Sequence, residues 1–335
     1  MKKHFNRFCH IGSIYSLLLY IAYSTDEQLR DTFYIFDWMI PNEFAQKFKN
    51  SYHFHRHSFI PRMFSWIDLF IQKKLFCPCI DKESELFAND HLWSSSAVID
   101  NHSYTLLEDS AGICSNYWCG NLRHKYESYR KSKSYKIRNF LFGSVEGFPH
   151  ANNEICTDLL LTTDDFPDYI SKKTIHRIKW FGLWNTFSKW KQEYIKNVYD
   201  ISTEDLDFIK TKKIVLFTQP LYPDLISAKE HERIYQAIIE KYPIEKMLIK
   251  VHPRDTFLYE KINEKLTIYR KTLPSQVFDM FGIKFSTAVT VFSSAAKNFE
   301  YPITIDWYGT ECSDELFKKV GRAIPPNNAC IKTLL

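Results

Sequence analysis

The chain has 335 residues, of which 45% are hydrophobic and 25% charged, and its formal net charge is +5. This length predicts two domains, and the composition is that of a globular protein rather than a disordered or fibrous one. No apolar run reaches the roughly 20 residues that a membrane-spanning helix needs, so at a membrane we expect the protein to lie on the surface. The eight cysteines are irregularly spaced and no secretory signal is evident, which favours a reduced, cytoplasmic location.

The first half of the chain predicts alternating strands and helices. A strand at 5–10, a helix at 14–24 and a strand at 32–36 open an α/β domain of the nucleotide-binding type. A mostly helical stretch is expected from 42 to 76, where only His53 and His57 would share a helix face. Because the sequence offers no third ligand for them, we expect no metal site.

Two further strands are predicted at 85–89 and 102–107, separated by a short helix. The second strand runs directly into Glu108 and Asp109. Two adjacent carboxylates are costly unless they are solvated or have a function, so this pair is a candidate for catalysis.

A basic segment at 123–138 carries seven Lys or Arg residues against one acid, Glu127. Such a segment suits anionic lipid head groups, a phosphorylated glycolipid or nucleic acid, although a solvated helix face or loop is an equally simple interpretation. Further on, residues 162–173 combine charged residues with Pro167 and predict a linker. The expected domains are therefore 1–165 and 174–335.

The second half predicts a regular βαβ alternation and a second parallel sheet. The expected strands lie at 213–218, 247–251, 266–269, 288–292 and 302–307. Helices are expected after Ser227, around 258–265, from 274 to 282, after Ser294 and at 313–320.

His252 follows the strand at 247–251, at the edge where open α/β sheets bind ligands. Pro253 restricts the backbone of His252 to extended conformations. Lys250 and Arg254 add positive charge on either side. This combination predicts a binding site for a phosphate group.

Ser293 and Ser294 follow another predicted strand and open a predicted helix. Hydroxyls and unpaired N–H groups at a helix N-terminus favour an anion, so these residues predict an anion site built without glycine. With His252, they indicate a nucleotide phosphate that departs during a reaction, protonated by the imidazole.

A base is expected on the opposite side of a cleft between the two domains. Glu108, Asp109 and Asp224 are all candidates, since a carboxylate held near a sugar hydroxyl is a competent base. The alternative is that Asp224 merely starts a helix and that the acidic pair caps a turn.

These motifs resemble those of a known family. The sequence Lys-x-His-Pro-Arg-Asp at 250–255, the Ser-Ser pair about 40 residues later and the acidic pair about 144 residues earlier are similar to bacterial sialyltransferases. The strongest resemblance is to the lipooligosaccharide sialyltransferases of glycosyltransferase family 52. It includes the segments Phe-Ala-Asn-Asp-His at 87–91 and Thr-Gln-Pro at 218–220.

The resemblance implies a GT-B architecture, with two Rossmann-type domains facing a central cleft. It also implies inverting, metal-independent transfer of sialic acid from CMP-sialic acid to a terminal galactose of a glycolipid, in an α-2,3 linkage. No cofactor and no nucleic acid are expected. The resemblance also implies contact with an anionic membrane surface, a peripheral location at the inner membrane and a homodimer. The implied catalytic residues are His252 as general acid and Asp109, Glu108 or Asp224 as base; the implied substrate-binding residues are Lys250, Pro253, Arg254, Gln276, Ser293, Ser294 and Gln219.

Two positions depart from the family pattern. Gln276 stands where the family often has a Glu that contacts the nucleotide, which leaves a transferase for another nucleotide sugar as an alternative. Ser110 stands where the acidic pair normally precedes Gly. It favours a second alternative, a basic peripheral protein that binds lipid or nucleic acid through 123–138 and has no activity.

Overall fold

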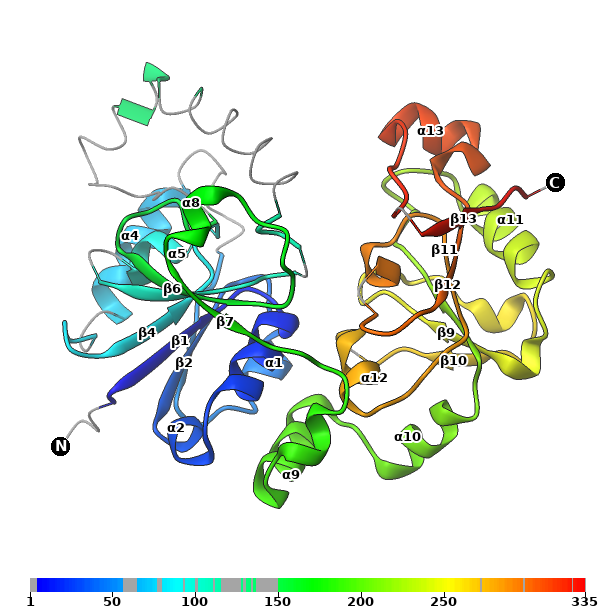
Figure 1. Ribbon diagram of the computed structural model, residues 1–335. Coiled ribbons are helices and arrows are strands. Elements are labelled where there is room, and N and C mark those ends of the chain that lie inside the picture. The colour runs from blue at the N-terminus through cyan, green and yellow to red at the C-terminus, as the bar shows by residue number, and fades with distance from the viewer. Residues whose placement is uncertain are drawn as a thin grey trace. The chain divides into compact units, whose positions relative to one another are not determined.

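The structure is a computed structural model of the chain (Figure 1). It describes residues 5–56, 65–76, 80–92, 94–99, 102–110, 112–115, 128, 131–133, 135–136, 150–271, 273–297, 299–326 and 328–334. The chain divides into two compact units, Met1–Lys179 and Trp180–Leu335. Both are α/β units built on a parallel sheet, which confirms the predicted fold class.

The described part of the first unit has a seven-stranded sheet of order β3-β2-β1-β4-β5-β6-β7. Its strands are β1 (Arg7–Ile11), β2 (Thr32–Phe36), β3 (Ser51–His53), β4 (Glu85–Ala88), β5 (Tyr104–Leu107), β6 (Cys156–Leu161) and β7 (Thr174–Arg177). Its helices are α1 (Ile14–Tyr23), α2 (Asp26–Arg30), α3 (Asn42–Ala45), α4 (Ser65–Phe76), α5 (Ser95–Ile99) and α8 (Asp168–Ser171). The strand order reverses between β1 and β4, which makes their carboxyl ends the expected binding position.

The described part of the second unit has a six-stranded sheet of order β10-β9-β8-β11-β12-β13. Its strands are β8 (Ile214–Phe217), β9 (Met247–Lys250), β10 (Thr267–Tyr269), β11 (Thr287–Thr290), β12 (Thr304–Trp307) and β13 (Ala329–Ile331). Its α-helices are α9 (Lys189–Tyr199), α10 (Thr203–Lys210), α11 (Ala228–Ile239), α12 (Gln276–Met280) and α13 (Asp314–Val320). Its 3₁₀ helices are η2 (Leu183–Thr186), η3 (Ile244–Lys246), η4 (Tyr259–Lys261), η5 (Ser294–Lys297) and η6 (Thr310–Cys312).

The central strands are buried apolar runs, as strands covered on both faces must be. Every residue of β8 and β9 is buried, and this explains why these strands are recognisable in the sequence. The helix α11 begins where Ser227 accepts the backbone N–H of Glu230 and packs Ile234, Tyr235, Ile238 and Ile239 into the core. The packing of α11 against this core fixes the positions of the carboxyl ends of β8 and β9.

The predicted linker at 162–173 is wrong. These residues connect β6 to β7 and contain α8, and β7 pairs with β6 in the first sheet. The division between the units falls after Lys179, so the first unit is longer than the predicted 1–165.

Several predicted helices are also corrected. The stretch 42–76 contains β3, so His53 is in a strand, and His57 lies outside the described residues. The helices expected at 258–265 and after Ser294 are short 3₁₀ helices.

Most of the basic segment at 123–138, including Arg130, lies outside the described residues, so its expected role at an anionic surface stays a prediction. Among the described helices, none has the length and apolar character needed to cross a membrane.

Candidate active site

The second unit brings three polar loops together after the neighbouring strands β9, β8 and β11. The backbone N–H of His252 donates to Oγ1 of Thr218 (3.0 Å), and the backbone N–H of Phe292 donates to Oε1 of Gln219 (2.9 Å). The strand order reverses between β8 and β11, so these loops lie where open α/β sheets bind ligands. Gln219 therefore connects the loop after β8 with the loop after β11.

His252 is half-buried at the end of β9, and its Nδ1 accepts the backbone N–H of Arg254 (3.1 Å). The ring proton of the neutral imidazole therefore belongs on Nε2. Burial, with the charges of Arg254 and Lys250, lowers the pKa of His252 to about 4. At neutral pH the residue is thus a neutral hydrogen-bond donor, and an anion beside it would raise this pKa.

Asp255 stabilises the loop that carries His252. Its buried carboxylate accepts hydrogen bonds from the Thr218 hydroxyl (2.6 Å), the Tyr259 hydroxyl (2.8 Å) and the backbone N–H of Phe257 (3.1 Å). Thr218 belongs to the Thr-Gln-Pro segment of the family resemblance, whereas the sequence offered no sign that Tyr259 belongs to this site. Together they fix the backbone that presents His252.

Lys250 is a buried cation without a carboxylate partner among the described residues. Its Nζ donates to the carbonyl oxygens of Lys271 (3.0 Å) and Val251 (3.3 Å), and burial lowers its pKa to about 8. Such a group favours an anion nearby. Pro253 and Arg254 are exposed at the same loop.

Ser293 lies directly before η5. Its backbone N–H donates to Oγ1 of Thr290 (2.8 Å), and its own Oγ accepts the backbone N–H of Ala295 (3.3 Å). η5 has four residues and is a 3₁₀ helix, so the predicted anion site does not lie at the N-terminus of a regular α-helix. Only local hydroxyl and amide groups could bind an anion there. The side chain of Ser294 lies outside the described part.

Gln276 and Asp224 occupy different environments. Gln276 is buried at the first turn of α12, and its Oε1 accepts the Ser275 hydroxyl (3.3 Å). Asp224 is exposed between β8 and α11, and no described residue bonds to its carboxylate. It does not start the helix, since Ser227 is the N-cap.

In the first unit, β1, β4 and β5 bring polar residues to one edge. Oδ1 of Asn89 accepts the backbone N–H of Gly12 (2.7 Å), and its Nδ2 donates to the carbonyl oxygen of Leu107 (2.8 Å). A Cβ on Gly12 would lie 2.0 Å from Cδ1 of Leu92, so a larger residue at this position would have to displace the Leu92 side chain.

Glu108 is fully buried after β5 and accepts four hydrogen bonds. The donors are the Tyr15 hydroxyl (3.2 Å), the backbone N–H (2.9 Å) and hydroxyl (2.7 Å) of Thr162, and the backbone N–H of Gly112 (2.7 Å). Burial nevertheless raises its pKa. This saturation of its acceptor positions favours a structural role for Glu108 over that of a base.

Asp109 differs sharply from its neighbour. Its Oδ2 contacts Nε2 of His91 (3.2 Å), whereas its buried Oδ1 has no hydrogen-bond partner in the described residues. Burial alone would raise the pKa of Asp109, but the hydrogen bond and charge of His91 outweigh it and hold the pKa below its usual value. The side chain is thus an ionised carboxylate whose buried Oδ1 has unused capacity to accept a hydrogen bond.

Two histidines complete this cluster: His91, which ends the Phe-Ala-Asn-Asp-His segment, and His150, which the sequence did not single out. The rings of His91 and His150 stack with centroids 5.0 Å apart. Asp90 accepts the backbone N–H of His150 (2.7 Å) and of Ala151 (2.8 Å), and also the Tyr104 hydroxyl (2.9 Å). His150 has a φ of 58°, an unusual conformation for a residue other than glycine, which these bonds maintain.

Asp90, His91 and His150 offer ligand atoms within 4.8 Å of one another, a possible metal site. Three hydrogen bonds already occupy Asp90, which leaves about one of its acceptor positions. The cluster therefore suits a metal poorly, and the expectation of a metal-independent enzyme stays a prediction.

The His91–Asp109 pair predicts a pH-dependent stability of the first unit. The raised pKa of His91 means that its stabilisation is complete below about 6.5 and is lost as pH rises through the folded-state pKa. The lowered pKa of Asp109 means that its contribution is lost on acidification. We expect His91→Gln to reduce the fall in melting temperature between about pH 6 and pH 8.5.

The matched control is His102→Gln, because His102 contacts only the backbone carbonyls of Ile80 (2.9 Å) and Ile99 (3.2 Å) among the described residues. That variant should keep the pH dependence of the wild type. An unchanged dependence in His91→Gln would contradict the proposed ion pair.

Comparison with known proteins identifies the family of the chain. Glycosyltransferase family 52 matches residues 39–311. An uncharacterized protein of Haemophilus influenzae is 31% identical over 244 residues, which are 72% of this chain and 73% of that protein.

Solved structures show the same fold. The α/β-galactoside α-2,3-sialyltransferase of Photobacterium phosphoreum has a TM-score of 0.58 at 12% identity, covering 98% of this chain and 99% of that one. The GT-B domain of a Photobacterium damselae sialyltransferase has a TM-score of 0.57 at 14% identity, covering 93% and 94%. With two Rossmann-type units and a family match over most of its length, this chain belongs to glycosyltransferase family 52, whose members use a nucleotide-sugar donor and a sugar acceptor.

Proposed function

We propose that this protein is an inverting, metal-independent sialyltransferase that moves sialic acid from CMP-sialic acid to a terminal galactose of lipooligosaccharide, in an α-2,3 linkage. Membership of family 52 and a fold shared with two bacterial sialyltransferases support this proposal. The observation that carries it is the presence of two chemistries. The second unit has a histidine between two cationic residues, and the first unit has an ionised carboxylate, one oxygen of which has no hydrogen-bond partner among the described residues.

The proposed donor site lies at the carboxyl edge of the second sheet, where the loops that carry His252, Gln219 and Ser293 meet. Lys250 and Arg254 supply positive charge for the phosphate of CMP, and Nε2–H of His252 donates to a phosphate oxygen. The bond between the anomeric carbon and that phosphate breaks, and its electron pair leaves with CMP. The anomeric carbon already bears a carboxylate and is tertiary, so charge stabilisation matters more than a strong nucleophile.

Asp109 is the base in this mechanism. Its Oδ1, which has no partner among the residues that the structure describes, accepts the proton of the galactose hydroxyl while the hydroxyl oxygen attacks the anomeric carbon from the face opposite CMP. A single displacement of this kind inverts the configuration. His91 holds the other carboxylate oxygen, and its charge keeps Asp109 ionised before the acceptor binds.

The test is a donor assay with purified protein, EDTA, a lactoside acceptor and either CMP-sialic acid or UDP-hexoses. We expect a sialylated product and free CMP in the presence of EDTA. Product mass and released nucleotide identify the donor, and loss of activity with EDTA would overturn metal independence. No turnover with CMP-sialic acid would overturn the proposed donor.

One residue favours a second candidate, a family member that uses another nucleotide sugar. Gln276 is neutral where the family often has an acid, and its buried side chain changes the charge available to a bound nucleotide. Turnover with a UDP-sugar alone would favour this candidate.

A further inference from the structure

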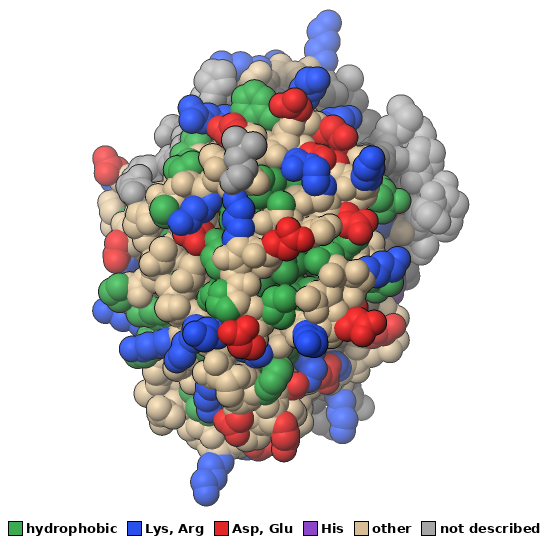
Figure 2. All heavy atoms as spheres, turned by 90° about the vertical axis from the view of Figure 1, so that its right-hand side faces the viewer, with side chains coloured by type: hydrophobic (Ala, Val, Ile, Leu, Met, Phe, Trp, Pro, Cys, Tyr) green, Lys and Arg blue, Asp and Glu red, His purple; other side chains and the backbone are tan. Residues whose placement is uncertain are grey.

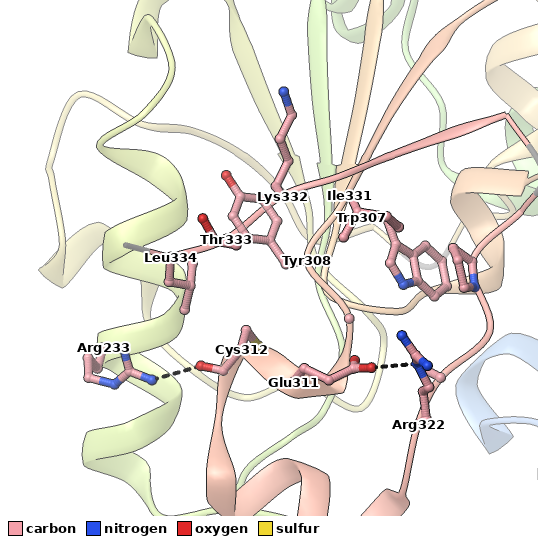
Figure 3. Close-up of a pocket in the computed structure, with 13 residues that line it drawn as sticks. Arg233, Trp307, Tyr308, Glu311, Cys312, Arg322, Ile331, Lys332, Thr333 and Leu334 are labelled. Carbon is pink, nitrogen blue, oxygen red and sulfur yellow. Dashed lines mark hydrogen bonds and ion pairs between the residues drawn. The ribbon is translucent and has the colours of Figure 1, made fainter.

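The cavity that adjoins the C-terminal residues of the second unit is balanced in charge. It measures about 520 Å³, and three cationic side chains contribute to its lining (Figure 3). Each of them pairs with a carboxylate of the same unit. The pairs are Arg233 with Glu230 (2.7 Å), Arg322 with Glu311 (2.9 Å) and Lys332 with Asp306 (3.3 Å). Figure 2, seen from the side where α11 and the C-terminus lie, shows Asp and Glu side chains interspersed with Lys and Arg. Among these described residues no uncompensated charge points to a ligand for the cavity.

The first unit, in contrast, exposes an aromatic ring and a cation that lack such partners. Trp38 lies just after β2 and is 38% exposed, and the guanidinium of Arg56 lies 5.2 Å from the centroid of its ring. Arg56 is itself half-buried. Among the residues that the structure describes, Arg56 has no carboxylate partner and Nε1 of Trp38 has no hydrogen-bond partner. The pair therefore has hydrogen-bond donors that are available to a ligand.

The loop that carries Trp38 is fixed by hydrogen bonds to neighbouring strand ends, all of them made by Asp37. The backbone N–H of Asp37 donates to the carbonyl oxygen of Ile11 in β1 (2.9 Å), and its carbonyl oxygen accepts Nε2–H of His53 in β3 (3.2 Å). Its buried carboxylate accepts the hydroxyl of Ser94, which follows β4. Trp38 is therefore exposed on an ordered loop, which lowers the conformational entropy that is lost when a ligand binds.

The loop after β2 and Asp109 belong to the same edge of the first sheet. β1 and β4 lie between β2 and β5 in this sheet, and the hydroxyl of Ser13 after β1 donates to the backbone carbonyl oxygen of Asp109 (2.8 Å). Since neighbouring strands lie about 4.8 Å apart, three strand spacings place the two loops roughly 14 Å from each other. A molecule with its reacting hydroxyl at Asp109 would therefore meet Trp38 with a more distant part.

An arginine stacked on an indole ring suits a sugar that carries an anionic group. The guanidinium has its N–H donors in a planar fork that matches a phosphate or a carboxylate, and stacking on the ring restricts its orientation. The indole combines an apolar ring with a polar N–H, and the face of a sugar ring that is formed by C–H groups is likewise apolar. A phosphate ion alone would leave the ring of Trp38 without a contact, and an acyl chain would leave Arg56 without a counterion.

We propose that Trp38 and Arg56 form a subsite for an inner sugar of the acceptor, with the ring of Trp38 against that sugar and Arg56 on its phosphate or carboxylate group. The inference rests on the proposed function, in which Asp109 receives the terminal galactose. An inner sugar takes no part in the bond changes, so its contacts stabilise the bound substrate and the transition state alike. The subsite therefore raises kcat/KM for long anionic acceptors relative to short neutral ones.

The experiment measures kcat/KM at saturating CMP-sialic acid with acceptors that differ away from the reacting galactose. They are a lactoside, a longer neutral oligosaccharide ending in galactose, and the same oligosaccharide with a phosphate or with a carboxylate on an inner sugar. We expect the wild type to prefer an anionic acceptor, and the two anionic forms show which group Arg56 binds.

Two substitutions separate the contributions of the ring and the charge. Trp38→Ala should lower the preference for the long acceptors over the lactoside at least about tenfold. Arg56→Gln should lower the preference for the anionic over the neutral long acceptor about tenfold. Arg56→Lys should be intermediate, because it keeps the charge and loses the planar fork.

The matched control is Lys47→Gln. Lys47 also lies over an aromatic ring, that of Phe44 (5.5 Å), but it precedes β3 on the amino side of the sheet. This variant should show the acceptor preferences of the wild type, and circular dichroism should show that all variants are folded. Equal kcat/KM of the wild type for all acceptors, or wild-type preferences in both Trp38→Ala and Arg56→Gln, would overturn the subsite and leave the proposed sialyltransferase activity standing.

Binding measured without a donor separates the subsite from the proposed activity. Saturation-transfer NMR with the phosphorylated oligosaccharide, in the presence of CMP, should show binding by the wild type and a weaker signal with Arg56→Gln. The same result in a protein that turns over no CMP-sialic acid would support the subsite and overturn the proposed donor. No binding by the wild type to either anionic oligosaccharide would overturn the subsite.

Discussion

Replacing His252 by alanine is expected to lower kcat by at least about a hundredfold with the fold retained. The variant removes the Nε2–H donor from the proposed phosphate site, and among the described residues the lost ring accepts one hydrogen bond, from the backbone N–H of Arg254. Steady-state rates at saturating CMP-sialic acid and acceptor, together with a melting temperature, measure both effects. Near-normal kcat would remove His252 from the mechanism.

A second substitution, His252→Gln, separates two roles for this residue. The family resemblance implies proton donation, whereas the neutral ring with its lone pair on Nδ1 bound to Arg254 favours hydrogen-bond donation. An amide N–H can donate a hydrogen bond but no proton, so we expect His252→Gln to be clearly more active than His252→Ala. Equally low activity of the two variants would contradict the hydrogen-bond role and favour proton transfer by His252.

Asp109→Asn is expected to lower kcat by at least about a hundredfold, since an amide cannot accept the proton of the acceptor hydroxyl. The protein should remain folded, because one oxygen of Asp109 has no hydrogen-bond partner in the described residues to lose. Initial rates with a lactoside acceptor and thermal unfolding measure the two properties.

The neighbouring substitution Glu108→Gln serves as the matched comparison. One oxygen of Glu108 becomes an NH₂ group that faces N–H and O–H donors, at an expected cost of about 1–3 kcal/mol in the free energy of unfolding. The opposite result would be a Glu108→Gln variant that keeps its stability and loses turnover, beside an Asp109→Asn variant that stays active. It would assign the role of base to Glu108.

The second sheet was largely readable from the sequence. Strands with continuous apolar runs, such as β8 and β9, lie within a residue of their predicted bounds, and His252 follows β9 as expected. The short edge strand β7, with the sequence Thr-Ile-His-Arg, has no such signal because none of its residues is fully buried. For the same reason the polar connection between β6 and β7 resembled a linker.

The sequence by itself determined the two α/β units, the polar residues at their strand ends and the family resemblance, because apolar periodicity and local motifs are written along the chain. The sequence did not distinguish the role of Glu108 from that of Asp109. Successive residues at a strand end point to opposite sides, and the sequence does not show what lies on each side. Only the tertiary structure buried Glu108 among four donors and set Asp109 beside His91. It also stacked His91 on His150, because contacts between residues so distant in the chain arise only when the sheet is assembled.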